Sequence, residues 1–159
     1  MYGGEGLASP EHQGGIVESN LIHDSAEMAI AIVNAEDGKV YHDTLFNNGE
    51  SIRIAPDRRH PPRISEADVA NNILDRPLRR RSGLTPAPQS NHVLLPSPAR
   101  APFVDVGRRD VRLRPSALAV IDRGADLGTD AARDYERTSR PQGRARDIGA
   151  FEHQPGLSR

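Results

Sequence analysis

The sequence predicts an all-β protein whose strands wind as a solenoid. Three segments, 17–22, 40–45 and 69–74, share one pattern: a valine, an Asn or Asp three residues later, and an aliphatic side chain two residues after that. The valines are 23 and 29 residues apart, and repeats of about 20 to 50 residues built from short strands and turns are typical of solenoids. No amphipathic helix pattern separates Ile52 from Leu74, so an alternation of strands and helices is not predicted.

The first repeat follows a Gly-rich, polar stretch, residues 1–14, which predicts a loop. Strand character runs over 15–22 and returns at 28–33, where apolar residues partly alternate. A helix over 25–34 is the alternative there, because Ala and Glu are good helix formers. Residues 34–38, Asn-Ala-Glu-Asp-Gly, predict a turn.

The second repeat begins with residues 39–46, which predict one strand. Asn and Gly then predict a turn, and residues 50–55 predict a half-buried strand in which isoleucines alternate with polar side chains. Residues 56–62 are a charged, proline-broken loop that lengthens the second step. The third repeat lies in 64–74, where strand character returns.

The repeat predicts columns of equivalent side chains. Rungs of parallel strands stack about 4.8 Å apart, so the valines and the aliphatic residues form two inward columns. The third column is polar, and an asparagine in it can donate from its amide to the next rung. We therefore expect a ladder in which Asp43 is the interruption, because an ionised carboxylate only accepts hydrogen bonds. The three predicted columns are Val17, Val40 and Val69; Ile22, Leu45 and Leu74; and Asn20, Asp43 and Asn72.

Composition restricts the function classes. The formal net charge is −1, so no overall positive field would attract nucleic acid or an anionic membrane. The absence of cysteine excludes disulfides and thiolate metal sites. No run of about 18 apolar residues predicts a membrane span, and the N-terminus has no signal-peptide pattern. Because the chain begins abruptly in the Gly-rich stretch, we expect it to be the C-terminal part of a longer protein whose upstream coils are missing.

Several segments resemble the last coils and tail of bacterial right-handed parallel β-helix proteins of the pectate-lyase-like type. The C-terminal motifs carry most of this resemblance, above all Arg-Pro-Gln-Gly at 140–143 followed by Asp-Ile-Gly-Ala-Phe-Glu at 147–152. The remaining similar segments are 14–20, 39–44, 71–75, 81–83, 111–115, 119–124 and 134–135.

The resemblance implies about three β-helix coils and an irregular C-terminal segment that closes the end of the same domain. The coils would occupy 1–95, most clearly 14–83, and the closing segment 96–159. Such proteins are normally exported or surface-attached, which implies an extracellular or cell-surface bacterial protein in a carbohydrate-related setting. Two departures stand out: Asp43 occupies a position that is often Asn, and Glu136-Arg137 replaces a frequent Asp-Gly.

Lyases and epimerases of this fold class generally use a basic or tyrosyl proton acceptor and neutralise the charge of an acidic sugar. The candidates that the resemblance points to are Tyr41, His42 and Arg53, on adjoining strands. The alternative is that these are ordinary surface or corner residues. No facing pair of carboxylates suited to glycoside hydrolysis is evident in the rungs.

The strongest charge cluster is Arg76-Pro-Leu-Arg-Arg-Arg81, in which Arg79, Arg80 and Arg81 are candidates for binding an acidic polymer. The alternative is a solvated loop after the third rung. Aromatic residues for base stacking are not interleaved, so we expect no nucleic-acid partner. Residues 82–102 are rich in Pro and Ser and predict a connector, with 91–95 as a short strand.

Three acidic residues, Asp130, Asp134 and Glu136, are the candidates for a calcium site, because calcium prefers several converging oxygen ligands. They do not follow a known calcium-loop spacing, and a solvated acidic loop with turn-capping carboxylates is the alternative. The six histidines form no closely spaced pair, so zinc is not predicted. We expect no other cofactor.

The sequence therefore favours a non-catalytic exported or surface module associated with polysaccharide. Two alternatives stay open at this point. The chain could be the remnant of a polysaccharide lyase or epimerase acting on acidic sugars, or an arginine-dependent polyanion-binding surface protein.

Overall fold

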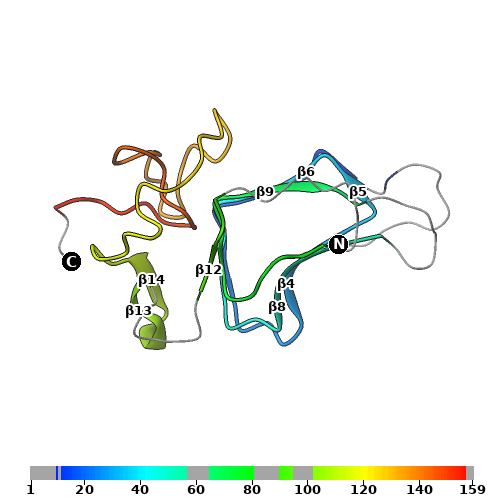
Figure 1. The fold of residues 1–159 in the computed structure, drawn as a ribbon, viewed down its shortest axis with the longest axis horizontal. Coiled ribbons are helices and arrows are strands. Elements are labelled where there is room, and N and C mark those ends of the chain that lie inside the picture. Colours follow the sequence, from blue (N-terminus) through cyan, green and yellow to red (C-terminus); the bar gives the residue numbers. More distant parts are fainter. Residues whose placement is uncertain (1–9, 11, 57–64, 81–89, 95–101, 157–159) are drawn as a thin grey trace.

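The computed structural model describes residues 10, 12–56, 65–80, 90–94 and 102–156 (Figure 1). These residues form an all-β structure dominated by three parallel sheets, which is compatible with the predicted β-solenoid. The strands of these sheets surround a roughly triangular interior, and the C-terminal residues lie to one side of it (Figure 1).

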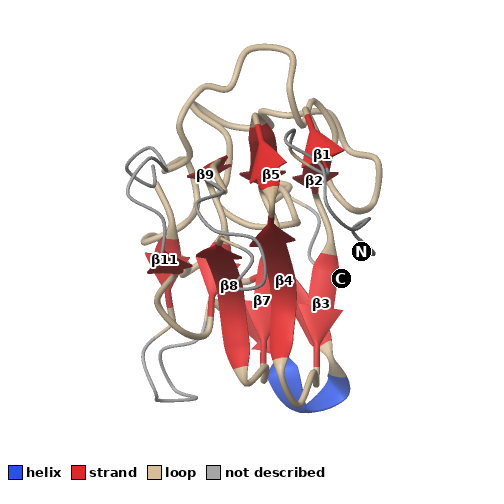
Figure 2. Ribbon diagram, turned by 90° about the vertical axis from the view of Figure 1, so that its right-hand side faces the viewer, coloured by secondary structure: helices blue, strands red, loops and turns tan. Residues whose placement is uncertain are grey.

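The chain visits the three sheets in the same order three times, and we call each passage a coil. Figure 2 shows strands of successive coils side by side. Coil 1 contains β2 (Ile16–Glu18), β3 (Leu21–His23) and β4 (Met28–Val33). Coil 2 contains β6 (Gly38–Tyr41), β7 (Thr44–Phe46) and β8 (Glu50–Ala55). Coil 3 contains β9 (Ala67–Ala70), β10 (Ile73–Leu74) and β11 (Arg79–Arg80).

Among the described residues, three further short strands in parallel pairs lie outside these coils. β12 (His92–Val93) pairs with β10 and so confirms the short strand predicted in the Pro-rich connector. β1 (His12–Gln13) pairs in parallel with β5 (Ala35–Glu36), inside the segment predicted to be a turn. Asn34 and Asp37, which flank β5, both have positive φ, so turn chemistry is present at both ends of this two-residue strand.

The predicted apolar columns are confirmed by the strand register. Val17 pairs with Val40 and Val40 with Val69, while Ile22, Leu45 and Leu74 stack in the neighbouring sheet. In the third sheet Ile30 and Ile32 pair with Ile52 and Ile54. These side chains fill the interior of the coils as one hydrophobic core.

The structure decides three local predictions. The strand character predicted over 28–33 is confirmed and the alternative helix over 25–34 is not formed, because the isoleucines of β4 bury better in a rung paired with β8 than on an isolated helix. The single strand expected over 39–46 is two strands, β6 and β7, separated by a corner at His42 and Asp43. The arginine cluster is not wholly loop, because Arg79 and Arg80 form β11 and pair with β8.

The corner between the first and second sheets repeats the same backbone conformation in every coil. The residue before each ladder position has positive φ, at 54°, 55°, 59° and 49° for Ser19, His42, Asn71 and Ser90. Asn tolerates this left-handed region because its short polar side chain bonds locally, whereas it is uncommon for most other side chains. His42 is thus placed by backbone geometry that turns the chain from one sheet into the next.

The C-terminal segment, residues 102–156, is largely irregular. Its only regular elements are a β-hairpin of β13 (Phe103–Asp105) and β14 (Asp110–Leu113), joined by the short 3-10 helix η2 (Val106–Arg108). A second hydrophobic core joins it to the outward-facing residues of β7 and β10, Phe46 and Ile73.

The C-terminal segment lies against the outer face of the β12–β10–β7–β3 sheet and not across the open edge of the stack (Figure 1). It bonds to Ser19 of coil 1, Thr44 of coil 2 and Asn71 of coil 3, so it runs along all three rungs. The expectation that this segment closes the end is therefore wrong for the residues that the structure describes. Burial of Phe46 and Ile73 explains the difference, because an outward apolar column needs a cover of its own.

Over the described ranges, we found no helix with the length and apolar character that a membrane crossing requires.

Candidate functional site at the buried corner

The predicted polar column is present as a hydrogen-bonded ladder at the first corner. Asn20 donates from its backbone N–H and its amide to Asp43 Oδ1, at 2.8 and 2.9 Å. The backbone N–H of Asp43 then donates to Asn72 Oδ1 at 2.8 Å. Asn72 in turn donates from its N–H and amide to Asn91 Oδ1, so Asn91 is a fourth member that sequence reasoning missed.

Asp43 is the weak member of the ladder. Its side chain is fully buried, and within the described part of the chain its Oδ2 accepts no hydrogen bond. Burial raises the pKa of Asp43 to about 7, against the lowering effect of the hydrogen bonds from Asn20. At the equivalent place Asn72 and Asn91 carry an amide that donates to the carbonyls of Val40 and Val69, each at 2.9 Å.

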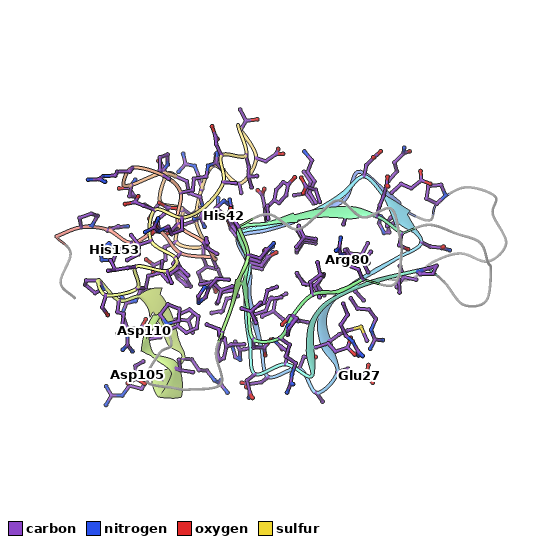
Figure 3. The ribbon with its side chains drawn as sticks, viewed as in Figure 1. Glu27, His42, Arg80, Asp105, Asp110 and His153 are labelled. Atoms are coloured by element: carbon purple, nitrogen blue, oxygen red, sulfur yellow. The ribbon has the colours of Figure 1, made fainter. Side chains whose placement is uncertain are left out.

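His42 is fully buried beside the ladder, beneath the C-terminal segment (Figure 3). Its Nε2 lies 3.0 Å from the amide nitrogen of Asn71, which makes Nε2 the acceptor of a neutral ring. Burial lowers the pKa of His42 to about 3, and the nearby charges of Arg140 and Arg146 lower it further. The imidazole is therefore neutral at physiological pH.

Tyr41 precedes the corner on β6 and is only 3% exposed. Its hydroxyl donates to Asp68 Oδ2 at 2.7 Å. Burial is the main cause that raises the pKa of the phenol, and this hydrogen bond raises it further. A phenol with a raised pKa is less easily deprotonated, which is opposite to what a tyrosyl proton acceptor requires.

Arg53 lies on β8, in a different sheet from Tyr41 and His42, so the structure does not bring the three catalytic candidates together. Its Nε donates to Glu50 Oε2 at 2.7 Å, and Arg79 Nη1 donates to Glu50 Oε1 at 2.6 Å. These two arginines lower the pKa of Glu50 to about 2, with the hydrogen bond from Arg53 as the largest cause. The register that pairs Arg79 with Arg53 thus forms an arginine pair around one carboxylate.

Of the other substrate-binding candidates, Arg80 pairs in register with Ile54 next to Arg79. Arg81 lies outside the described residues.

Two of the three calcium candidates, Asp130 and Asp134, accept hydrogen bonds from other groups of the protein. Asp130 Oδ2 accepts from Lys39 Nζ at 2.6 Å, and the carboxylate of buried Asp134 accepts the backbone N–H groups of Thr138 and Glu152. Glu136 is exposed. In the part of the chain that the structure describes, no three acidic or histidine side chains converge as metal ligands would.

A second ladder lies at the corner between the second and third sheets, and sequence reasoning did not find it. The backbone N–H of Ser25 donates to Asn48 Oδ1 at 3.0 Å, and that of Asn48 donates to Asp75 Oδ2 at 2.6 Å. Its members are three different residue types, so no repeated letter marks the column.

The two C-terminal motifs form a buried ion pair. Arg140 Nη1 donates to Glu152 Oε1 at 2.7 Å, and both side chains are fully shielded from solvent. Glu152 also accepts the backbone N–H groups of Gln142 and Asp147, at 3.0 and 2.8 Å. Arg140 Nη2 donates to the carbonyl of Gly149 at 3.0 Å. The segment therefore has a polar centre that holds its irregular backbone in place.

The C-terminal segment seals the corner where Tyr41 and His42 lie. Asn71 of coil 3 exchanges hydrogen bonds with Ala125, at 2.9 and 2.7 Å, and its carbonyl accepts the N–H of Gly149 at 2.7 Å. The N–H of Ala150 donates to Thr44 Oγ1 at 2.9 Å. Among the described residues, this cover leaves His42 fully buried.

The comparisons with known proteins leave the resemblance to pectate-lyase-like proteins a prediction. Family models, curated proteins and solved structures were all searched, and none of the three searches returned a match to this chain.

Proposed function

We propose that this chain is a non-catalytic module of a right-handed parallel β-helix that binds acidic polysaccharide at the cell surface or outside the cell. The right-handed path is supported by a general rule, because crossovers between parallel strands of one sheet are almost always right-handed. The carbohydrate setting and the location follow from the resemblance of the C-terminal motifs and the rungs.

The observation that carries the non-catalytic role is the sealed corner. The two residues best suited to proton transfer, Tyr41 and His42, are buried. Burial raises the pKa of Tyr41, which makes its phenolate harder to form, and lowers the pKa of His42, which makes its imidazole a weaker base. A general base must lie within hydrogen-bonding reach of the proton that it removes. His42 instead bonds to Asn71 under the C-terminal segment. This placement supports a structural role for both side chains.

The polysaccharide-binding face in this proposal is the arginine pair of Arg53 and Arg79. Adjacent rungs place these guanidinium groups on neighbouring strands, with Arg79 56% exposed at its side chain. Guanidinium groups bind carboxylates in a planar, often bidentate geometry. Glu50 holds both arginines in place while neutralising only one of the two charges.

The test uses polygalacturonate with the wild-type chain and an Arg53→Gln/Arg79→Gln double variant. We expect saturable binding that weakens at high salt and is lost in the double variant. The matched control is Arg123→Gln, which removes an exposed arginine of the C-terminal segment. Unchanged binding by the double variant would exclude the arginine pair as the binding face.

The same polymer tests the lyase alternative. Cleavage by a lyase creates an unsaturated sugar that absorbs in the ultraviolet, so a spectrophotometric time course reports it directly. We expect no absorbance increase. A steady increase that disappears in His42→Asn or Tyr41→Phe would show that the corner opens in solution and that the chain is an enzyme.

A further inference from the structure

A pocket in the C-terminal segment is not part of the corner or of the arginine pair. It has a volume of about 640 Å³ and lies between β14 and the stretch 151–156. Ligand pockets for small molecules usually have volumes of about 300 to 1,000 Å³. Leu113 and Phe151 contribute its apolar lining, while Arg114, Glu136 and His153 contribute polar groups.

Arg114 is held rigidly at this pocket. Its Nε donates to the carbonyl of Phe103 at 2.6 Å, and its Nη2 lies 3.4 Å from the carbonyl of Val104. Within the described residues its Nη1 makes no hydrogen bond and no carboxylate pairs with it. The guanidinium is thus oriented by backbone carbonyls and keeps its full charge, which favours binding of an anion without reorganisation.

The other charges around the pocket are partly cancelled. Arg112 donates to Asp110 through Nε at 2.8 Å and through Nη2, and Glu152 is neutralised by Arg140. In the described part of the chain, the side chains of Glu136 and His153 make no hydrogen bond, and the charge of Glu136 interacts with that of Arg112 without a direct ion pair. His153 lies on the side of the molecule away from the coil interior (Figure 3). The pocket therefore offers one cation, one carboxylate and one imidazole.

We propose that this pocket binds a small carboxylate ligand that also carries a hydroxyl or ammonium donor. The carboxylate would pair with Arg114, the donor with Glu136, and His153 would bond to a further polar atom between them. The apolar lining from Leu113 and Phe151 would contact the ligand's carbon skeleton. Two sources share this chemistry: a sugar acid, whose donors are hydroxyls, and an amino acid, whose donor is an ammonium.

The test is a titration of the isotope-labelled full chain with galacturonate and, separately, with serine, followed by amide NMR shifts. We expect at least one of them to give saturable shifts centred on 112–114 and 151–156. Galacturonate binding would identify a sugar-acid site, and serine binding an amino-acid site. Glu136→Gln should weaken serine more than galacturonate, because only an ammonium loses a full ion pair.

Two variants make the result decisive. Arg114→Gln should weaken binding by about tenfold or more, the usual effect of losing one charge-assisted hydrogen bond. His153→Gln should weaken binding without disturbing the fold, because the ring has no intramolecular partner among the described residues. The matched control is Arg123→Gln, whose binding should equal that of the wild type.

Two outcomes would overturn the proposal: no saturable shifts with either acid, or undiminished affinity in both Arg114→Gln and His153→Gln. The result is separable from the polysaccharide proposal. Arg53→Gln/Arg79→Gln should keep full binding of the small acid. This double variant therefore tests polymer binding, whereas Arg114→Gln and His153→Gln test binding in the pocket.

Discussion

Asn20 donates twice to one oxygen of Asp43, whereas the other oxygen of Asp43 is buried without a hydrogen-bond partner among the described residues. At the next rung the corresponding atom is the amide nitrogen of Asn72, which donates both to Asn91 Oδ1 and to the carbonyl of Val40. An amide at position 43 would therefore find two acceptors, which the carboxylate of Asp43 cannot use. By the same register, these acceptors are Asn72 Oδ1 and the carbonyl oxygen of Val17.

At about pH 4, where the titration of Asp43 has not yet begun to reduce stability, Asp43→Asn should stabilise the protein by about 0.5 to 1.5 kcal/mol, the usual net contribution of one hydrogen bond. The new amide removes an unsatisfied buried oxygen and completes the ladder. Thermal or urea unfolding measures the change. Asp37→Asn is the control, because it makes the same chemical change at an exposed position outside the ladder. A melting temperature that stays the same or falls would mean that the ladder is not limited by Asp43.

The advantage of Asp43→Asn should increase with pH between about 4 and 7. Burial raises the folded-state pKa of Asp43 to about 7 from its ordinary 3.8. In this window the unfolded wild type loses a proton that the folded wild type keeps, so wild-type stability falls as pH rises. Asparagine does not titrate and lacks this loss. Urea unfolding of both proteins across the window measures the difference, and a constant difference would show that Asp43 titrates normally in the fold.

The rungs were predictable from sequence because their residues obey a local period. Val17, Val40 and Val69 repeat at steps that strand register requires, and a one-residue slip would turn every apolar side chain outward. Asn91 escaped the pattern because Pro88 stands where the repeat has a valine. The side-chain oxygen of Asn91 continues the ladder without a valine three residues before it.

The state of the corner was not predictable, because long-range contacts determine it. His42 is buried by Asn71 and by backbone from the C-terminal segment, and the hydrogen bond from Ala125 to Asn71 spans 54 positions. No local pattern around His42 encodes that cover. In the same way, the motifs at 140–143 and 147–152 stood out as a signature, but nothing in their spacing indicated that Arg140 and Glu152 form a buried ion pair.

Glu152→Gln should destabilise the protein by about 3 to 5 kcal/mol, because it leaves the charge of Arg140 buried and unpaired. Chemical denaturation measures the loss, and Glu136→Gln is the control at an exposed carboxylate of the same segment. The double variant Arg140→Met/Glu152→Leu should recover part of the loss, since it removes both charges together. Equal stability of Glu152→Gln and wild type would show that water reaches the pair.

Gly149→Ala should loosen the C-terminal segment from the coils. Gly149 has φ of 98°, where an L side chain is strained, and an added Cβ would lie 2.6 Å from Ile73 Cδ1 and 2.8 Å from Thr44 Oγ1. We expect a loss of about 1 to 3 kcal/mol from overpacking alone. Faster proteolysis within 117–152 would show that the loss is local to the segment.

Gly15→Ala is the matched control for this change, because nothing lies within 4 Å of its added Cβ and its φ is not positive. It should leave both stability and proteolysis unchanged. The hydrogen bond from the N–H of Gly149 to the carbonyl of Asn71 is one of the contacts that bury His42. Gly149→Ala should therefore raise the pKa of His42 from about 3 towards its ordinary 6.5, since burial is the main cause of the lowering. NMR titration of the His42 ring measures this shift. A ring that stays neutral at pH 5 in Gly149→Ala would show that the corner remains closed without that contact.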